Sequence, residues 1–79
     1  MRVLIIDDER SIRNTLKEIL EFEGHQITLA ADGAEGLEAA SSASFDVIFC
    51  DIKMPGMDGI EVLDKLMAMG IDSSVVMIT

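Results

Sequence analysis

The chain has 79 residues with 15 Asp or Glu against 6 Lys or Arg, which gives a formal net charge of −9. This length allows one small domain at most, with a core near the lower size limit of independent stability. The acidic balance argues against nucleic acid or an anionic membrane as a direct partner, because both are bound through clustered Lys and Arg, and it favours a basic partner or a divalent cation.

Cysteine usage and hydropathy predict a cytoplasmic protein. The single Cys50 cannot form an internal disulfide, and no apolar run approaches the roughly 18 residues that span a bilayer. Residues 1–2 lead into a short strand and then into acids, which is not the pattern of a signal peptide.

The first 30 residues are expected to form a strand, a helix and a second strand. Residues 3–6 are a continuous run of branched aliphatic side chains, typical of a strand buried on both faces. Residues 10–22 are predicted to form an amphipathic helix that ends near Gly24. Its apolar stripe consists of Ile12, Leu16, Ile19 and Leu20. Alternation at Ile27 and Leu29 indicates a short strand nearer an edge.

The rest of the chain continues the alternation of helices and strands. Asp32 is a plausible N-cap, with Glu35 three residues later, for a second helix that runs to about Ala43. Residues 47–50 form the third strand and residues 74–79 the fourth.

Between these strands, a third helix is predicted from a cap at Asp58 to an end at Gly70. Its apolar stripe is expected to contain Ile60, Leu63, Leu66 and Met67. The order is therefore βαβαβαβ with short connections, which predicts an α/β domain with right-handed crossovers and helices on both faces of a parallel sheet.

Three of the four strands run directly into an acid or a hydroxyl. Residues 3–6 are followed by Asp7, Asp8 and Glu9, residues 47–50 by Asp51, and the last strand ends in Thr79. If these strands are parallel neighbours, their polar ends meet at the carboxyl edge of the sheet, where ligands bind in open α/β folds.

Carboxylates that converge in this way repel one another, and a cation would neutralise them. Mg²⁺ suits such an oxygen-rich site and commonly brings phosphate oxygens with it. Asp51 could then act as a nucleophile towards phosphorus, and Thr79 could donate its hydroxyl to a phosphoryl oxygen.

Simpler explanations exist for each residue taken alone. The acids at 7–9 could be solvated side chains at the start of a helix, favoured by its dipole. Asp51 could be a turn former ahead of Pro55 and Gly56, and Thr79 could have no role. Their joint placement on three strand ends favours a common site.

Three motifs also carry a resemblance to a known family. They are V-L-I-I-D-D-E at 3–9, F-D-V-I-F-C-D-I-K-M-P-G-M-D-G at 45–59 and V-V-M-I-T at 75–79. Over all 79 residues the chain resembles the N-terminal part of a response-regulator receiver domain of two-component signalling. The resemblance implies a flavodoxin-like fold, here with strand order 2-1-3-4.

The resemblance also implies a role for each site residue. Asp51 would be the phosphoacceptor for a phosphoryl group from a sensor histidine kinase, and Thr79 the switch hydroxyl. Mg²⁺ would be held by Asp7, Asp8, Asp51 and the backbone carbonyl of Lys53. The module would be a signalling domain and not an enzyme.

A complete receiver continues with a fourth helix, a fifth strand that carries a lysine, and a fifth helix. Residues 1–79 are therefore expected to be a partial receiver domain. The hydrophobic fraction of 49% is high for so short a chain, and the outer edge of the fourth strand would be unpaired beside a strip of Ile, Val and Leu. We expect self-association through this edge.

Two other functions are consistent with part of the pattern. The chain could be a structural or folding fragment of a receiver that self-associates and retains little or no phosphotransfer activity. It could also be a hydrolase with an aspartyl nucleophile, although such an enzyme needs a second carboxylate two residues after the nucleophile, where this chain has Lys53.

Overall fold

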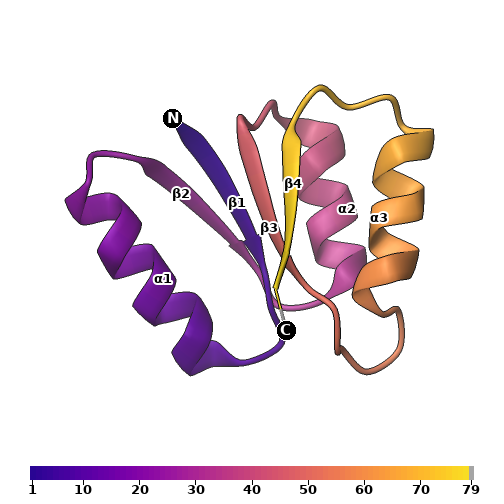
Figure 1. The fold of residues 1–79 in the computed structure, drawn as a ribbon, viewed down its shortest axis with the longest axis horizontal. Helices are drawn as coiled ribbons and strands as arrows, with labels where there is room; N and C mark the ends of the chain where they lie inside the picture. Colours follow the sequence, from indigo (N-terminus) through magenta and orange to yellow (C-terminus); the bar gives the residue numbers. More distant parts are fainter. Residues whose placement is uncertain (79) are drawn as a thin grey trace.

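The structure is a computed structural model that describes residues 1–78. Four strands alternate with three helices along the chain (Figure 1). The elements are β1 Arg2–Ile6, α1 Arg10–Phe22, β2 Gln26–Ala30, α2 Gly33–Ser42, β3 Val47–Asp51, α3 Gly59–Ala68 and β4 Ser74–Ile78. The predicted elements are confirmed in type and order, with ends that differ by one or two residues.

The four strands form one parallel sheet in the order β2-β1-β3-β4. Ile6 of β1 lies between Ala30 of β2 and Cys50 of β3, so all three of these strands end at the same level. Helix α1 lies on one face of the sheet, and α2 and α3 lie on the other (Figure 1). This is the predicted α/β flavodoxin-like arrangement, in which strand order reverses between β1 and β3.

Two predicted helix starts are confirmed by hydrogen bonds. The Asp32 carboxylate accepts a hydrogen bond from the backbone N–H of Glu35 at 2.8 Å, at the start of α2. Asp58 does the same for the backbone N–H of Glu61 at 2.9 Å, at the start of α3. Each acid therefore satisfies a backbone donor that the first helical turn leaves without an intrahelical partner.

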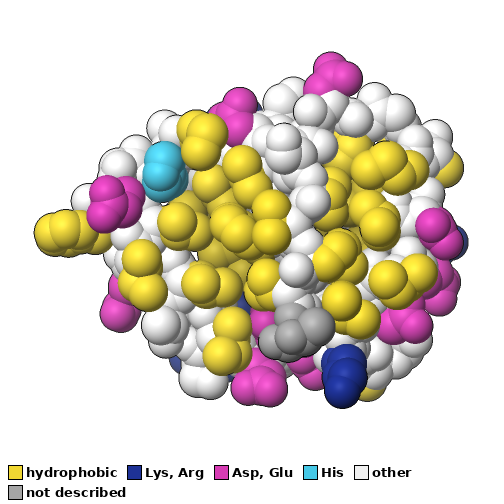
Figure 2. Space-filling view, viewed as in Figure 1, with side chains coloured by type: hydrophobic (Ala, Val, Ile, Leu, Met, Phe, Trp, Pro, Cys, Tyr) yellow, Lys and Arg dark blue, Asp and Glu magenta, His cyan; other side chains and the backbone are white. Residues whose placement is uncertain are grey.

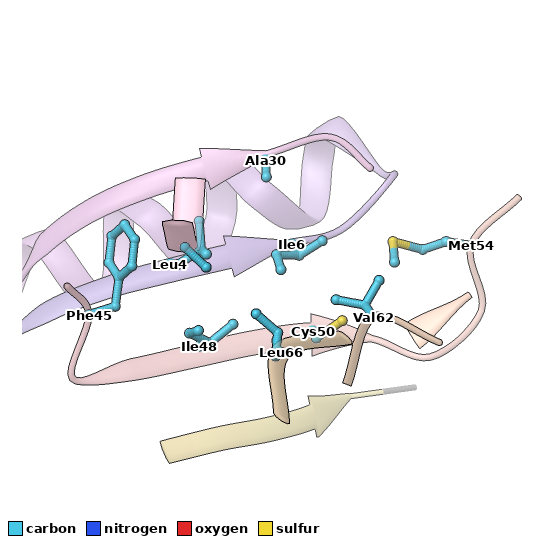
Figure 3. Packing of buried hydrophobic residues seen from close by; sticks show 10 residues of the cluster. Leu4, Ile6, Ala30, Phe45, Ile48, Cys50, Met54, Val62 and Leu66 are labelled. Carbon is cyan, nitrogen blue, oxygen red and sulfur yellow. The ribbon is translucent and has the colours of Figure 1, made fainter. Parts of the chain in front are cut away.

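The hydrophobic core lies between the sheet and the α2/α3 layer. Figure 3 shows Leu4 and Ile6 of β1 and Ile48 and Cys50 of β3 in the same layer as Leu66 of α3. The other buried members are Ala30, Ala40, Phe45, Met54 and Val62. Every second residue of β1 and β3 enters this layer, as the two-residue period of a strand requires.

The predicted apolar stripe of α3 is wrong in two of its four members. Leu66 is buried and Leu63 is half-buried, but Ile60 is 50% exposed and Met67 is 58% exposed. The buried face of α3 consists instead of Gly59, Val62 and Leu66. Because α3 carries apolar residues around most of its circumference, periodicity could not select the face that packs on the sheet.

Helix α1 has the predicted bounds, yet none of its residues is fully buried. Leu16 and Leu20 are half-buried, whereas Ile12 and Ile19 are exposed. On the same face of the sheet, Val76 of β4 is exposed as well. Figure 2 shows hydrophobic side chains gathered on both sides of β4, which is an edge strand of the sheet among residues 1–78.

Within residues 1–78, every helix is too short or too polar to pass through a lipid bilayer.

The core arrangement predicts unequal costs for truncating two neighbouring residues of α3. Leu66→Ala should lower the free energy of unfolding by about 2–5 kcal/mol, because it opens a cavity in the buried layer. Met67→Ala, at an exposed position of the same helix, should cost well under about 1 kcal/mol. Urea unfolding followed by far-UV circular dichroism measures both, and equal costs would contradict the assigned face of α3.

Candidate cation and phosphoryl site

Three carboxylates meet at the carboxyl edge of the two central strands. Asp7 and Asp8 directly follow β1, and Asp51 is the last residue of β3. One carboxylate oxygen of each lies within 4.8 Å of the others. Asp7 is 4% exposed and Asp51 is 9% exposed, while Asp8 is open to solvent. The burial of Asp7 excludes the interpretation as a simply solvated acid for that residue, whereas Asp8 and Glu9 are exposed.

The turn from β1 into α1 is held by hydrogen bonds to Asp7. The backbone N–H of Asp7 donates to the carbonyl of Ala30 at 3.1 Å. Asp7 Oδ1 accepts the backbone N–H of Glu9 at 2.8 Å, and the Asp7 carbonyl accepts Arg13 Nη1 at 2.7 Å. Asp7 therefore enters the site with a fixed backbone. Arg13 lies on the polar side of an amphipathic helix, where its sequence position carries no signal of this contact.

The segment after β3 is anchored by three backbone N–H groups. The backbone N–H of Lys53 donates to Asp51 Oδ1 at 3.2 Å. The backbone N–H of Ile52 donates to the carbonyl of Ile78 in β4 at 2.9 Å, and the N–H of Gly59 donates to the carbonyl of Ile52 at 2.9 Å. Lys53, whose carbonyl was predicted to be a metal ligand, is therefore held next to Asp51 by its own backbone N–H.

Gly59 is required by the close approach of α3 to the end of β3. A Cβ at this position would lie 2.7 Å from Ile52 Cα and would also meet the backbone carbonyl of Asp51. Backbone atoms cannot move aside as a flexible side chain can, so only glycine allows this contact. The sequence predicts a helix start at Asp58 but carries no signal of this contact at Gly59.

The electrostatics of the cluster oppose ionisation of Asp51. Burial raises the pKa of Asp51 most strongly, and the neighbouring Asp7 and Asp8 carboxylates raise it further. The hydrogen bond from the Lys53 N–H acts in the other direction. The main causes are desolvation and like charge. A bound cation would directly relieve the repulsion between the like charges.

The donor set fits Mg²⁺. It consists of hard carboxylate oxygens from three side chains, with one side of the cluster open to water through Asp8. Mg²⁺ binds through few carboxylates and keeps several waters, so it does not need a closed protein cage. Cys50 is no competitor for metal or phosphorus, since burial raises the pKa of its thiol to about 11, with Asp51 and Asp7 adding to the effect.

The structure thus brings together three of the predicted site residues, Asp7, Asp8 and Asp51. Thr79, the predicted switch hydroxyl, lies outside the described residues.

Asp51→Asn should stabilise the metal-free chain at neutral pH. A raised pKa means that the folded state binds the proton more tightly than the unfolded chain, so the ionised carboxylate lowers the free energy of unfolding. The gain in the free energy of unfolding should shrink as pH falls through the raised pKa of Asp51. It should vanish below 3.8, the ordinary pKa of an Asp carboxyl.

Urea unfolding at a series of pH values in EDTA measures this difference. Asp64→Asn is the control, because it removes the same charge at an exposed position on α3. Equal stabilisation by the two variants would show that only net charge matters, and not the environment of Asp51.

Comparison with known proteins agrees with this geometry. The family model described as the response regulator receiver domain matches residues 3–79. Response regulator MprA of Mycobacterium avium is 38% identical over 79 residues, and MprA of Mycobacterium leprae is also 38% identical. The chain spans 35% of the length of each of these curated relatives.

Solved structures show the same fold. Chemotaxis protein CheY4 of Vibrio cholerae has a TM-score of 0.92 and 36% identity over 96% of this chain and 65% of its own. TrrA of Thermotoga maritima, in complex with Mg(2+)-BeF, has a TM-score of 0.91 and 38% identity over 96% and 66%. The receiver domain of the hybrid histidine kinase CckA has a TM-score of 0.90 and 30% identity over 98% and 73%. The chain belongs to the response regulator receiver domain family.

Proposed function

We propose that this chain is the phosphoacceptor module of a two-component response regulator. Asp51 would accept a phosphoryl group from the phosphohistidine of a sensor histidine kinase, with Mg²⁺ at the site. The observation that carries the proposal is the convergence of Asp7, Asp8 and Asp51 within 4.8 Å at the ends of β1 and β3. Such a cluster is costly without a cation and is suited to phosphoryl chemistry with one.

Asp7, Asp8, Asp51 and the backbone carbonyl of Lys53 would hold the metal. Mg²⁺ would supply positive charge that offsets the charge of the phosphoryl oxygens. Support comes from the pKa of Asp51, which burial raises most and Asp7 and Asp8 raise further. It also comes from TrrA, a relative at 38% identity whose structure is a complex with Mg(2+)-BeF.

The chemistry assigned to this chain's own residues is a transfer between two nucleophiles. A carboxylate oxygen of Asp51 forms the new P–O bond while the P–N bond to the donor histidine breaks, and the imidazole leaves with the electron pair. The Lys53 N–H, 3.2 Å from Asp51 Oδ1, orients the carboxylate for this attack. Thr79 would donate its hydroxyl to a phosphoryl oxygen.

The proposed partner is a sensor histidine kinase, and the proposed location is the cytoplasm, where such a kinase would present its phosphohistidine. Neither nucleic acid nor a membrane is proposed as a direct partner of these residues, in keeping with the net charge of −9. A hydrolase is less well supported, because the position two residues after Asp51 is Lys53 and not a carboxylate.

Phosphorylation tests the proposal directly. A small-molecule phosphoryl donor with Mg²⁺ should add one phosphoryl group to the chain, and intact-mass spectrometry should detect it. Asp51→Asn should abolish the addition, and EDTA should prevent it. Asp64→Asn, a matched change at an exposed site on α3, should leave it intact.

Two results would count against this function. Phosphorylation that persists in Asp51→Asn would place the acceptor elsewhere. Saturable Mg²⁺ binding without phosphorylation of the wild type would favour the alternative, a receiver fragment that has lost phosphotransfer.

We also propose that the chain self-associates with a second copy through the surface around β4. Strand β4 pairs only with β3 among residues 1–78. Hydrophobic side chains lie on both sides of it (Figure 2), and Val76 of β4 itself is exposed. An unpaired edge beside an apolar surface favours pairing with another chain.

Light scattering at micromolar concentration should therefore report a species larger than a monomer. Because each copy carries a charge of −9, added salt should screen their repulsion and strengthen the association. Val76→Glu, which places a charge on the exposed face of β4, should weaken it. A monomer at all salt concentrations, with cooperative unfolding, would rule out self-association.

A further inference from the structure

We propose that Arg13 is a positioning residue that couples the cation site to helix α1. Its guanidinium would fix the direction in which Asp8 leaves the β1–α1 turn, so that metal loading and docking of α1 stabilise each other. The inference rests on the proposed Mg²⁺ site and adds to it a residue outside the predicted ligand set.

The first observation is that α1 is weakly attached to the rest of the domain. None of its residues is fully buried, and its apolar contacts come from half-buried side chains such as Leu16 and Leu20. Its N-cap residue, Glu9, makes no side-chain capping hydrogen bond. The position of its first turn therefore depends on other contacts.

Asp7 supplies those contacts. The Glu9 N–H donates to Asp7 Oδ1 at 2.8 Å, and Arg13 Nη1 donates to the Asp7 carbonyl at 2.7 Å. Both bonds join the start of α1 to a residue whose carboxylate belongs to the cluster. The bond from Arg13 involves a charged donor and a half-buried side chain, which makes it stronger than a neutral surface contact.

The bond from Arg13 also acts on Asp8 through covalent geometry. The Asp7 carbonyl and the Asp8 nitrogen and Cα lie in one peptide plane. A hydrogen bond that restrains this carbonyl therefore restrains the plane, and with it the N–Cα bond of Asp8, about which its side chain turns. Asp8 is the exposed member of the cluster. Its side chain has the most freedom to lose when a cation binds.

Charge and positioning predict opposite effects for Arg13. As a cation near the cluster, Arg13 repels a divalent ion, so its removal would tighten binding if charge were its only contribution. If Arg13 is a positioning residue, its removal would let Asp8 sample orientations that do not bind the ion. The apparent affinity would then fall in proportion to the fraction of molecules with Asp8 in the binding orientation. The sign of the change in affinity therefore separates the two roles.

Arg10 is a matched control. It is the first residue of α1, is exposed, and has no hydrogen-bond partner among the described residues for its side chain. Arg10→Met removes the same charge from the same turn of the helix without breaking the bond to Asp7. Arg13→Met removes both the charge and the hydrogen bond to the Asp7 carbonyl. Arg13→Lys keeps the charge on a side chain that can still donate to this carbonyl.

Cation affinity is the first readout. The chain has no Trp and no Tyr, so free Mn²⁺ is measured by electron paramagnetic resonance. We expect Arg13→Met to weaken binding by about 10-fold, as loss of a residue that supports a metal ligand typically does. Arg13→Lys should recover part of this loss, and Arg10→Met should bind as tightly as the wild type or more tightly. Equal affinities of Arg13→Met and Arg10→Met would overturn the proposal.

Amide hydrogen exchange of the wild type is the second readout, and it holds even if Arg13→Met fails to fold. Coupling between two sites is reciprocal, so saturating Mg²⁺ should slow exchange of the amides of α1 relative to EDTA. In Arg13→Met this protection should be lost.

Metal binding that leaves the α1 amides of the wild type unchanged would refute the coupling while leaving the cation site intact. A wild type that binds neither Mn²⁺ nor Mg²⁺ would instead refute the proposed function, and the inference with it.

Discussion

The parallel pairing of β1 with β3 is the constraint on which the rest of the structure depends. It places Ile6 beside Cys50, so the residues that follow, Asp7, Asp8 and Asp51, meet at one edge. The same pairing builds the core, because alternate residues of both strands point into the α2/α3 layer. Strand order reverses between these two strands, which leaves space above their ends for a ligand. The site is therefore a consequence of sheet topology and not of any local motif.

The cluster is the part of the fold that is unfavourable without a ligand. Desolvation and like charge both oppose the ionised Asp51, and the surrounding backbone holds the acids together despite this. Gly59 lets α3 approach the backbone of β3 without a clash, and the hydrogen bonds of Asp7 tie β1 to α1. Electrostatic repulsion of this kind is common at functional sites where a bound ligand relieves it. A divalent cation is the ligand that these charges and oxygens favour.

Packing is unequal on the two faces of the sheet. The α2/α3 face has a continuous buried core (Figure 3), whereas α1 covers only part of its own face. Hydrophobic side chains lie on both sides of the edge strand β4, where Val76 is exposed (Figure 2). The solved receivers that match are longer than this chain, which covers 65% of CheY4 and 66% of TrrA. In residues 1–78 the helices cover the α2/α3 face of the sheet more completely than the α1 face, unlike in a sheet covered evenly on both faces.

The sequence by itself determined the order of the elements, the caps at Asp32 and Asp58, and the residues at the strand ends, because these depend on local periodicity and turn chemistry. It also predicted that the acids would converge, since parallel strands share a carboxyl edge. Only the tertiary structure decided which face of α3 is buried, that Asp7 is shielded while Asp8 is open, and that Arg13 and Gly59 shape the site. These features arise from contacts between residues whose spacing carries no periodic signal, so they follow from how the elements pack and not from the pattern within any one of them.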